Sequence, residues 1–276
     1  MPKGEGKGWA KGRTAVTDPR VAHYAASHRG MSYRRHGVYP RTLPLEWSDE
    51  MAYVVGLMAT DGCLIKTGRH LSFDSADEQL VRTFLRCLGR PLNYAAVPTR
   101  TGGIAYKAQF SDVRFYQWLL TIGLMPRKSL TLGAIDVPDG FLLPVVRGLL
   151  DGDGHISNFV HHPTPGTFPE YEYERFWVYF NSASRPHLEW LKRRLSALLS
   201  IDGYMERRPP REGRREFFRL KCGKHASSVL MQRLYEDPQA PRLERKWAIW
   251  DRYARENGLL CGRRDLNPHA LADNRP

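Results

Sequence analysis

The chain has 276 residues, with 42 Lys and Arg against 29 Asp and Glu, so its net charge is +13. A chain of this length buries a substantial core as one large domain or two smaller ones, and the basic excess predicts a polyanionic partner such as nucleic acid. Four cysteines without close spacing exclude a disulfide scaffold, and the absence of a long apolar run excludes a membrane protein, so we expect a cytoplasmic protein.

Residues 1–44 are predicted to form an irregular basic arm, because nine lysines and arginines face only two acidic residues there. Such arms are usually solvated, and beside a DNA-binding body they can lie along the backbone.

The first half, 45–135, is predicted to open with a helix from Ser48 to Ala59. Ser48 is a typical N-cap, and the acidic residues at 49 and 50 suit the helix dipole. Gly62 can take the left-handed conformation that ends helices. The further predicted elements are strands at 63–66 and 70–74, a helix from 77 or 78, a hairpin of 94–97 and 104–110, and a helix at 113–122.

The second half, 136–257, repeats this order. The segment Phe73-Asp74-Ser75-Ala76 matches Phe180-Asn181-Ser182-Ala183, which supports internal duplication. The second copy carries an insertion at 161–173, and the tail 258–276 is expected to be disordered. The predicted elements are a helix ending at 154, strands near 155–160, 176–180, 204–208 and 217–221, and helices near 186–199, 227–235 and 244–257.

Two apolar helical segments, Val54–Gly62 and Val146–Gly154, both end in Asp-Gly. An acidic residue is unfavourable at the C-terminal end of a helix, which already carries partial negative charge. The repetition of this unfavourable choice in a basic chain indicates a function for both acids.

Small residues in these segments, Gly56 and Gly148, allow the two helices to pack closely. Asp61 and Asp153 are then expected to meet at the helix ends, where their mutual repulsion pushes one toward protonation unless a cation intervenes. Hard divalent cations with oxygen ligands suit such a site. Metals bound there could activate water and stabilise the oxygens of a phosphodiester.

With both motif copies and their matching flanks, residues 45–257 resemble the single-chain LAGLIDADG (DOD-type) homing endonucleases. The resemblance implies an α+β fold of two pseudo-symmetric αββαββα repeats, with paired central helices over two antiparallel sheets that form a DNA-binding saddle. It also implies that Asp61 and Asp153, at the eighth motif position, are catalytic. They would bind Mg²⁺, with Mn²⁺ as an expected substitute, together with the backbone carbonyls of Thr60 and Gly152.

The resemblance further implies a lysine after the last helix of each half, near the scissile phosphate. Lys128 and Lys246 fit this position and are expected to orient water or neutralise transition-state charge; the alternative is a solvated or phosphate-contacting lysine. At the sixth motif position, Ala59 replaces the common aspartate in the first copy, whereas Asp151 keeps it in the second.

The strands after each motif are expected to contact DNA, because alternation sends every second side chain to one face. Arginine can recognise guanine through two hydrogen bonds, whereas most lysines bind phosphate. The histidines at 161 and 162 lack partners at zinc-ligand spacing. The candidate DNA contacts are Lys66, Arg69, Arg100, Tyr106, Lys107, Gln109, Asn158, Arg175, Arg207, Arg208, Arg211, Arg214, Arg215, Arg219 and Lys221.

The sequence therefore predicts a monomeric, site-specific endonuclease of double-stranded DNA. It would cut a long asymmetric target and leave short 3′ overhangs, as the resemblance implies. The alternative is a non-catalytic nucleic-acid binder on the same fold, either an intron RNA maturase or a transcription regulator. An intein-borne nuclease is less favoured, because no splicing flanks are visible.

Overall fold

The computed structural model describes residues 14, 16–28, 43, 45–66, 68–99, 101–162, 172–210 and 216–259. The chain divides into two compact units, 1–40 and 41–276, which are described separately. Residues 163–171 of the predicted insertion and residues 260–276 of the predicted tail lie outside the described residues. Among the residues that are described, no helix is long and apolar enough to cross a membrane.

The first unit contains helix α1 (Pro19–His28), where the sequence predicted irregular structure. Pro19 occupies the first helical position, for which its fixed φ is suited. The amide of Arg20 donates a 2.9 Å hydrogen bond to the carboxylate of Asp18, which satisfies a free N–H at the helix start. The prediction missed these two local signals.

The first half of the second unit follows the predicted order. Helix α2 begins after Ser48, whose side chain accepts a 3.1 Å hydrogen bond from the Met51 amide. Gly62 does not adopt the left-handed conformation. Glycine is required at this position for a different reason: a Cβ there would lie 2.5 Å from the Cα of Met58. The elements are α2 (Asp49–Thr60), β1 (Gly62–Leu64), β2 (His70–Ser75), α3 (Glu78–Cys87), β3 (Tyr94–Pro98), β4 (Ile104–Ser111), α4 (Val113–Thr121) and the 3₁₀ turn η1 (Lys128–Leu130).

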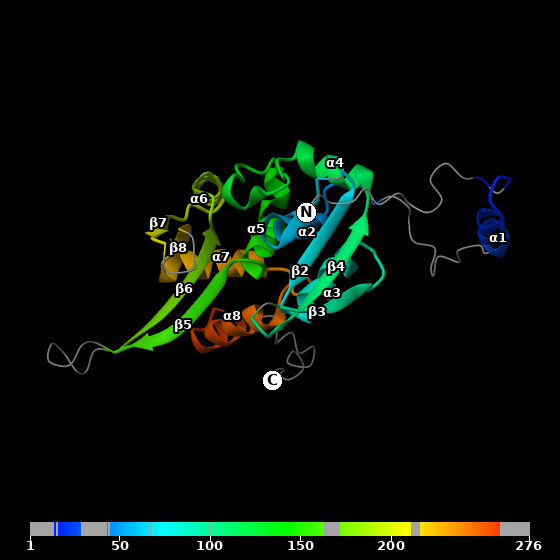
Figure 1. Cartoon of the computed structure of the whole chain (residues 1–276). Coiled ribbons are helices and arrows are strands. Elements are labelled where there is room, and N and C mark those ends of the chain that lie inside the picture. Colours follow the sequence, from blue (N-terminus) through cyan, green and yellow to red (C-terminus); the bar gives the residue numbers. More distant parts are fainter. Residues whose placement is uncertain are drawn as a thin grey trace, which may run out of the picture. The chain divides into compact units, whose positions relative to one another are not determined.

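The second half repeats the sequence of helix, two strands, helix, two strands and helix, which confirms the predicted α+β repeat (Figure 1). Its elements are η2 (Asp139–Phe141), α5 (Leu142–Asp151), β5 (His155–His161), β6 (Tyr173–Ser182), α6 (Arg185–Leu199), β7 (Gly203–Arg208), β8 (Phe217–Cys222), α7 (Lys224–Leu234) and α8 (Glu244–Glu256).

The strands form two four-stranded antiparallel sheets of the same order, β1-β2-β4-β3 and β5-β6-β8-β7. Alternate residues of β2, such as Leu71 and Phe73, are buried beneath α3 and α4. In the second sheet Phe176, Val178 and Phe180 of β6 are buried in the same way. Each sheet therefore has one face on the core, and its intervening residues form an outer face turned away from the helices.

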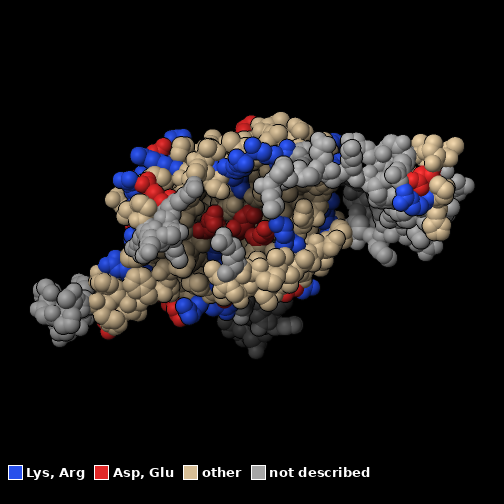
Figure 2. Space-filling model, in the orientation of Figure 1, with Lys and Arg blue, Asp and Glu red and all other residues tan. Residues whose placement is uncertain are grey.

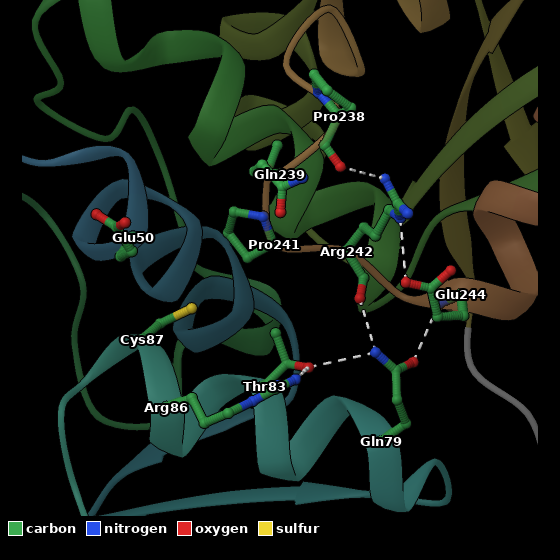
Figure 3. A pocket seen from close by; sticks show the side chains of 11 residues that line it. Glu50, Gln79, Thr83, Arg86, Cys87, Pro238, Gln239, Pro241, Arg242 and Glu244 are labelled. Atoms are coloured by element: carbon green, nitrogen blue, oxygen red, sulfur yellow. Dashed lines mark hydrogen bonds and ion pairs between the residues drawn. The ribbon is translucent and has the colours of Figure 1, made fainter.

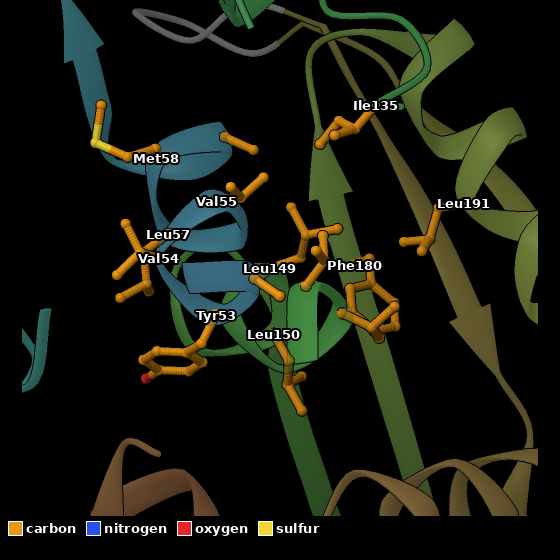
Figure 4. Close-up of a cluster of buried hydrophobic side chains, with 14 of the residues drawn as sticks. Tyr53, Val54, Val55, Leu57, Met58, Ile135, Leu149, Leu150, Phe180 and Leu191 are labelled. Carbon is orange, nitrogen blue, oxygen red and sulfur yellow. The ribbon is translucent and has the colours of Figure 1, made fainter. Parts of the chain in front are cut away.

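Helices α2 and α5 lie at the centre of the core (Figure 4). Every residue of α2 from Met51 to Ala59 and every residue of α5 except Leu143 is buried. A helix that is apolar on all sides is stable only when other elements surround it. Since the two helices pack along each other and reach both sheets, the two halves share one core.

Candidate functional site

The backbones of α2 and α5 touch where Gly56 meets Gly148. A Cβ on Gly56 would lie 2.2 Å from the carbonyl oxygen of Val145 and 2.8 Å from the Cα of Gly148. One turn further along, a Cβ on Gly152 would lie 2.0 Å from the Oγ1 of Thr60. No residue with a side chain fits such distances, so the glycines of the two motifs bring the C-terminal ends of both helices together.

Asp61 and Asp153 follow directly after these helix ends. Asp61 is half-buried, and burial together with the charge of Asp153 raises its pKa to about 7. Asp153 reaches the surface, yet the surrounding protein excludes enough water to raise its pKa as well. Figure 2 shows acidic side chains gathered in a hollow of this face, with lysines and arginines around it. The structure thus brings the two motif acids into one electrostatic site.

The donor set of this site suits a hard divalent cation, because it consists of carboxylate and carbonyl oxygens. Two neighbouring carboxylates are stabilised when a cation shares their charge. Within the described residues, no group of three or more His, Cys, Asp or Glu side chains could hold a metal ion. A cation here would therefore need carbonyl oxygens, water or phosphate in addition to the two acids.

Lys128 and Lys246 are buried, and their ammonium groups bind the ends of the motif helices. Lys128 follows α4 and donates from Nζ to the carbonyl oxygens of Thr60, at 3.2 Å, and Gly62. Lys246 lies in the first turn of α8. Its Nζ donates to the carbonyl oxygens of Leu150 at 2.6 Å, Asp151 at 2.8 Å, Gly152 at 3.2 Å and Gly154 at 2.7 Å.

These contacts explain why a buried ammonium is stable at each helix end. The last carbonyls of a helix lack intrahelical donors and carry partial negative charge, which a lysine satisfies. Burial lowers the pKa of Lys246 to about 8 and that of Lys128 in the same direction. The sequence predicted these lysines beside the scissile phosphate; the structure places their Nζ atoms on the protein's own carbonyls, including the predicted metal ligands of Thr60 and Gly152.

Asp151, at the sixth motif position, has hydrogen-bond partners that the sequence did not reveal. Its Oδ2 accepts 2.8 Å hydrogen bonds from the hydroxyl of Tyr53 and from the amide of Leu243. Burial raises its pKa to about 6. Asp151 therefore ties α5 to α2 and to the start of α8, whereas Ala59 simply packs in the core.

Each half also has one basic residue on the outer face of its sheet that contacts a neighbour of the motif acid. In the first half Lys107 pairs with Asp74 at 3.2 Å. In the second half Arg219 donates a 3.1 Å hydrogen bond to Asn181, whose amide in turn binds the carbonyl of Asp153 at 2.9 Å. Sequence reasoning missed the roles of Asp74 and Asn181. The signal was present, because both lie at the same place in the matched segments that follow the motifs.

The predicted DNA contacts divide by sheet face. Lys66 and Arg69 are exposed in the turn between β1 and β2. Arg100, Arg211, Arg214 and Arg215 lie outside the described residues. Those on the outer faces are Lys107, Gln109, Arg175, Arg208, Arg219 and Lys221, as the strand register shows.

Three of the predicted contacts lie on the opposite face of their sheet, not on the outer face where the prediction put them. Tyr106 packs against the core beside Tyr94, with ring centroids 6.1 Å apart. Asn158 lies opposite the buried Phe176. Arg207 shares the face of the core and pairs with Glu216 at 2.7 Å. In each case the strand register, which the sequence leaves open by one residue, decides the face.

A separate cavity of about 380 Å³ lies between α3 and the segment that precedes α8 (Figure 3). Gln79 spans it, donating to the carbonyl of Arg242 at 2.8 Å and accepting from the amide of Glu244 at 3.0 Å. None of the predicted site residues lines this cavity. These hydrogen bonds join the two halves of the unit.

No family model and no curated protein matches the sequence. The structure is similar to the meganuclease I-SmaMI bound to uncleavable DNA, with a TM-score of 0.52 and 10% identity over 77% of this chain and 92% of that chain. It also matches the LAGLIDADG homing endonuclease I-LtrWI bound to target DNA, with a TM-score of 0.47 and 11% identity over 76% and 92% of the two chains. Full-length DUF199/WhiA from Thermatoga maritima matches with a TM-score of 0.46 and 15% identity over 83% of this chain and 66% of that chain. The protein therefore has the α+β fold of the LAGLIDADG homing endonucleases, with one motif copy in each half.

Proposed function

We propose that the protein is a site-specific endonuclease that hydrolyses both strands of double-stranded DNA. One observation carries the proposal: two acids with raised pKa values follow two helix ends that touch through glycine. The fold is shared with a DNA-bound meganuclease, and the chain has a large basic excess, which supports DNA as the partner.

Asp61 and Asp153 would hold Mg²⁺, or Mn²⁺ in its place, together with carbonyl oxygens of Thr60 and Gly152. When bound, the metal lowers the pKa of coordinated water and stabilises charge on phosphate oxygens. Lys246 and Lys128 keep the two helix ends in place, because their ammonium groups bind four and two carbonyls of their own motifs respectively.

Lys107 and Arg219 would bind the phosphates on either side of the acid pair. Each lies on an outer sheet face and pairs with a residue, Asp74 or Asn181, that directly adjoins a motif acid. An arginine in one half and a lysine in the other give unequal phosphate contacts. A single chain supplies both acids and two different sheets, so we expect a monomer that cuts an asymmetric site and leaves short 3′ overhangs.

The test is cleavage of a randomised duplex library, followed by assays on the selected site with Mg²⁺ and with Ca²⁺. Asp61→Asn and Asp153→Asn should each abolish double-strand cutting while the duplex remains bound. Asp202→Asn removes an exposed carboxylate outside the site and should cut as the wild type does. Full double-strand cutting by either motif variant would contradict the proposal.

A second candidate is a non-catalytic nucleic-acid binder, such as an intron RNA maturase or a transcription regulator. One observation favours it: the lysine ammonium groups already bind the Thr60 and Gly152 carbonyls that a metal would share. Tight duplex or RNA binding without cleavage in Mg²⁺ or Mn²⁺ would identify this function.

A further inference from the structure

The outer faces of the two sheets differ in chemistry although the sheets share one strand order. The outer face of the first sheet carries small or polar side chains such as Ser72 and Gln109, and its described residues include no Phe, Tyr or Trp. The corresponding face of the second sheet is aromatic. Its rings belong to Phe159, Tyr173, Trp177, Tyr179, Tyr204 and Phe217.

The aromatic residues of β6 on this face form one row that ends beside Asp153. Tyr173, Trp177 and Tyr179 occupy alternate positions with Arg175, so their side chains share a face. Same-face neighbours in a strand are about 7 Å apart, so the row extends for about 20 Å. The next same-face residue is Asn181, which binds the carbonyl of Asp153. The row therefore leads outward from the candidate site.

Tyr179 is buried, but core packing does not account for the other rings. Phe159 is 40% exposed, Tyr173 is 39% exposed and Tyr204 is 68% exposed. The core of this half contacts the other face of the sheet, and β5 and β6 extend beyond the helices that cover it (Figure 1). Phe159 and Trp177 meet edge to face at 5.3 Å, which fixes the ring orientations without burying them.

Cationic side chains cover the ring faces. The Nζ of Lys221 lies 3.4 Å from the ring centroid of Trp177, and the guanidinium of Arg175 lies 4.4 Å from that of Tyr173. Lysine and arginine side chains are long and flexible, and a phosphate can draw them off a ring. A nucleic-acid strand would then supply a base for each ring and a phosphate for each cation.

We propose that this outer face binds single-stranded DNA by stacking unpaired bases on Phe159, Tyr173, Trp177 and Tyr204. Arg175 and Lys221 bind the phosphates. An intact duplex keeps its base faces stacked inside the helix, so exposed rings gain more from an unpaired strand. The inference goes beyond the proposed function by adding single-stranded DNA as a second ligand of this sheet, and it rests on DNA as the partner in that function.

The experiment measures binding of the full chain to fluorescein-labelled oligothymidylate by anisotropy, in EDTA. Stacking of one base on a ring contributes enough that its loss weakens binding about tenfold or more. The double variant Phe159→Ala/Trp177→Ala should therefore lose at least this much affinity. The matched double variant Val113→Ala/Leu198→Ala removes two exposed apolar side chains from helices α4 and α6 and should bind as the wild type does.

An abasic oligonucleotide separates stacking from charge, because it keeps the phosphates and removes the bases. The wild type should bind it as weakly as the double aromatic variant binds oligothymidylate. Equal binding of abasic and normal strands, or unchanged binding by the aromatic variant, would overturn the proposal. Tighter binding of oligouridylate than of oligothymidylate would overturn the choice of DNA.

Two further variants show whether a loss of strand binding reflects misfolding and whether strand binding depends on the proposed nuclease site. Trp177→Phe keeps a stacking ring and should retain binding, with less quenching of tryptophan fluorescence by the strand. Asp61→Asn/Asp153→Asn should bind oligothymidylate normally, since the row does not use the acids. Loss of binding in Trp177→Phe despite a native circular dichroism spectrum would contradict stacking.

Discussion

The ammonium group of Lys246 donates a 2.7 Å hydrogen bond to the carbonyl oxygen of Gly154, the last residue of the second motif. The same nitrogen also binds the carbonyl oxygens of Leu150, Asp151 and Gly152, so one side chain from α8 caps the C-terminal end of α5. In the first half Lys128 closes the end of α2 with two such bonds. The lysines therefore fix the geometry of the site through the backbone.

Replacing Lys246 by Met should destabilise the protein more than replacing Lys128 by Met. The first change leaves four carbonyl oxygens without their donor and the second leaves two. Because buried carbonyls that lose a charged donor cost about 1–3 kcal/mol each, we expect Lys246→Met to lower the free energy of unfolding by at least about 3 kcal/mol. Urea unfolding measures this, with Lys66→Met as the exposed control. A smaller loss for Lys246→Met than for Lys128→Met would contradict the assignment.

Gly56→Ala and Gly148→Ala should each destabilise the fold, because the new Cβ would overlap a backbone oxygen at 2.2 Å and 2.3 Å respectively. Forcing the helices apart costs about 1–3 kcal/mol or more. Gly140→Ala is the matched control, since a Cβ there meets nothing within 4 Å. Thermal melts of the three variants test this; an unchanged melting temperature for Gly56→Ala would show that the helices do not touch at this point.

Asp61→Asn should stabilise the metal-free protein, and the gain should grow with pH. Burial raises the pKa of Asp61 to about 7 in the folded chain, whereas an unfolded aspartate titrates near about 4. Between these values the folded chain holds a proton that the unfolded chain has lost, so wild-type stability falls as the pH rises. Asparagine has no charge to bury, so its advantage should be larger at pH 8 than at pH 4.

Calorimetry in EDTA at the two pH values checks this expectation, and Asp202→Asn serves as the exposed control. Equal gains at both pH values would mean that Asp61 titrates normally in the fold.

Lys107→Ala and Arg219→Ala should weaken duplex binding and reduce its dependence on salt. A lost phosphate contact lowers the slope of log affinity against log salt by about 1. Arg207→Ala is the control, because Arg207 lies on the opposite face and pairs with Glu216. Anisotropy titrations at several salt concentrations provide the slopes. A reduced slope for Arg207→Ala alone would reverse the assignment of the two faces.

The sequence predicted the fold well because its signals are local. Ser48 acts as the predicted N-cap, and the internal match between the segments after Phe73 and Phe180 revealed the repeat. The tertiary features escaped prediction. The carbonyls that need the Lys246 ammonium become unsatisfied only when α5 ends beside α8, and the side of the sheet taken by Tyr106 depends on pairing with β2 and β3.

The close approach of Gly56 to Gly148 also limits how the chain could be divided. Each of the two helices forms part of the interior of the other half, so a fragment that holds only one of them would expose an apolar helix to water. Two co-expressed fragments would have to associate before either became soluble. Assembly of the site around Asp61 and Asp153 is thus inseparable from folding, and a fragment with one motif helix should aggregate before it could bind DNA.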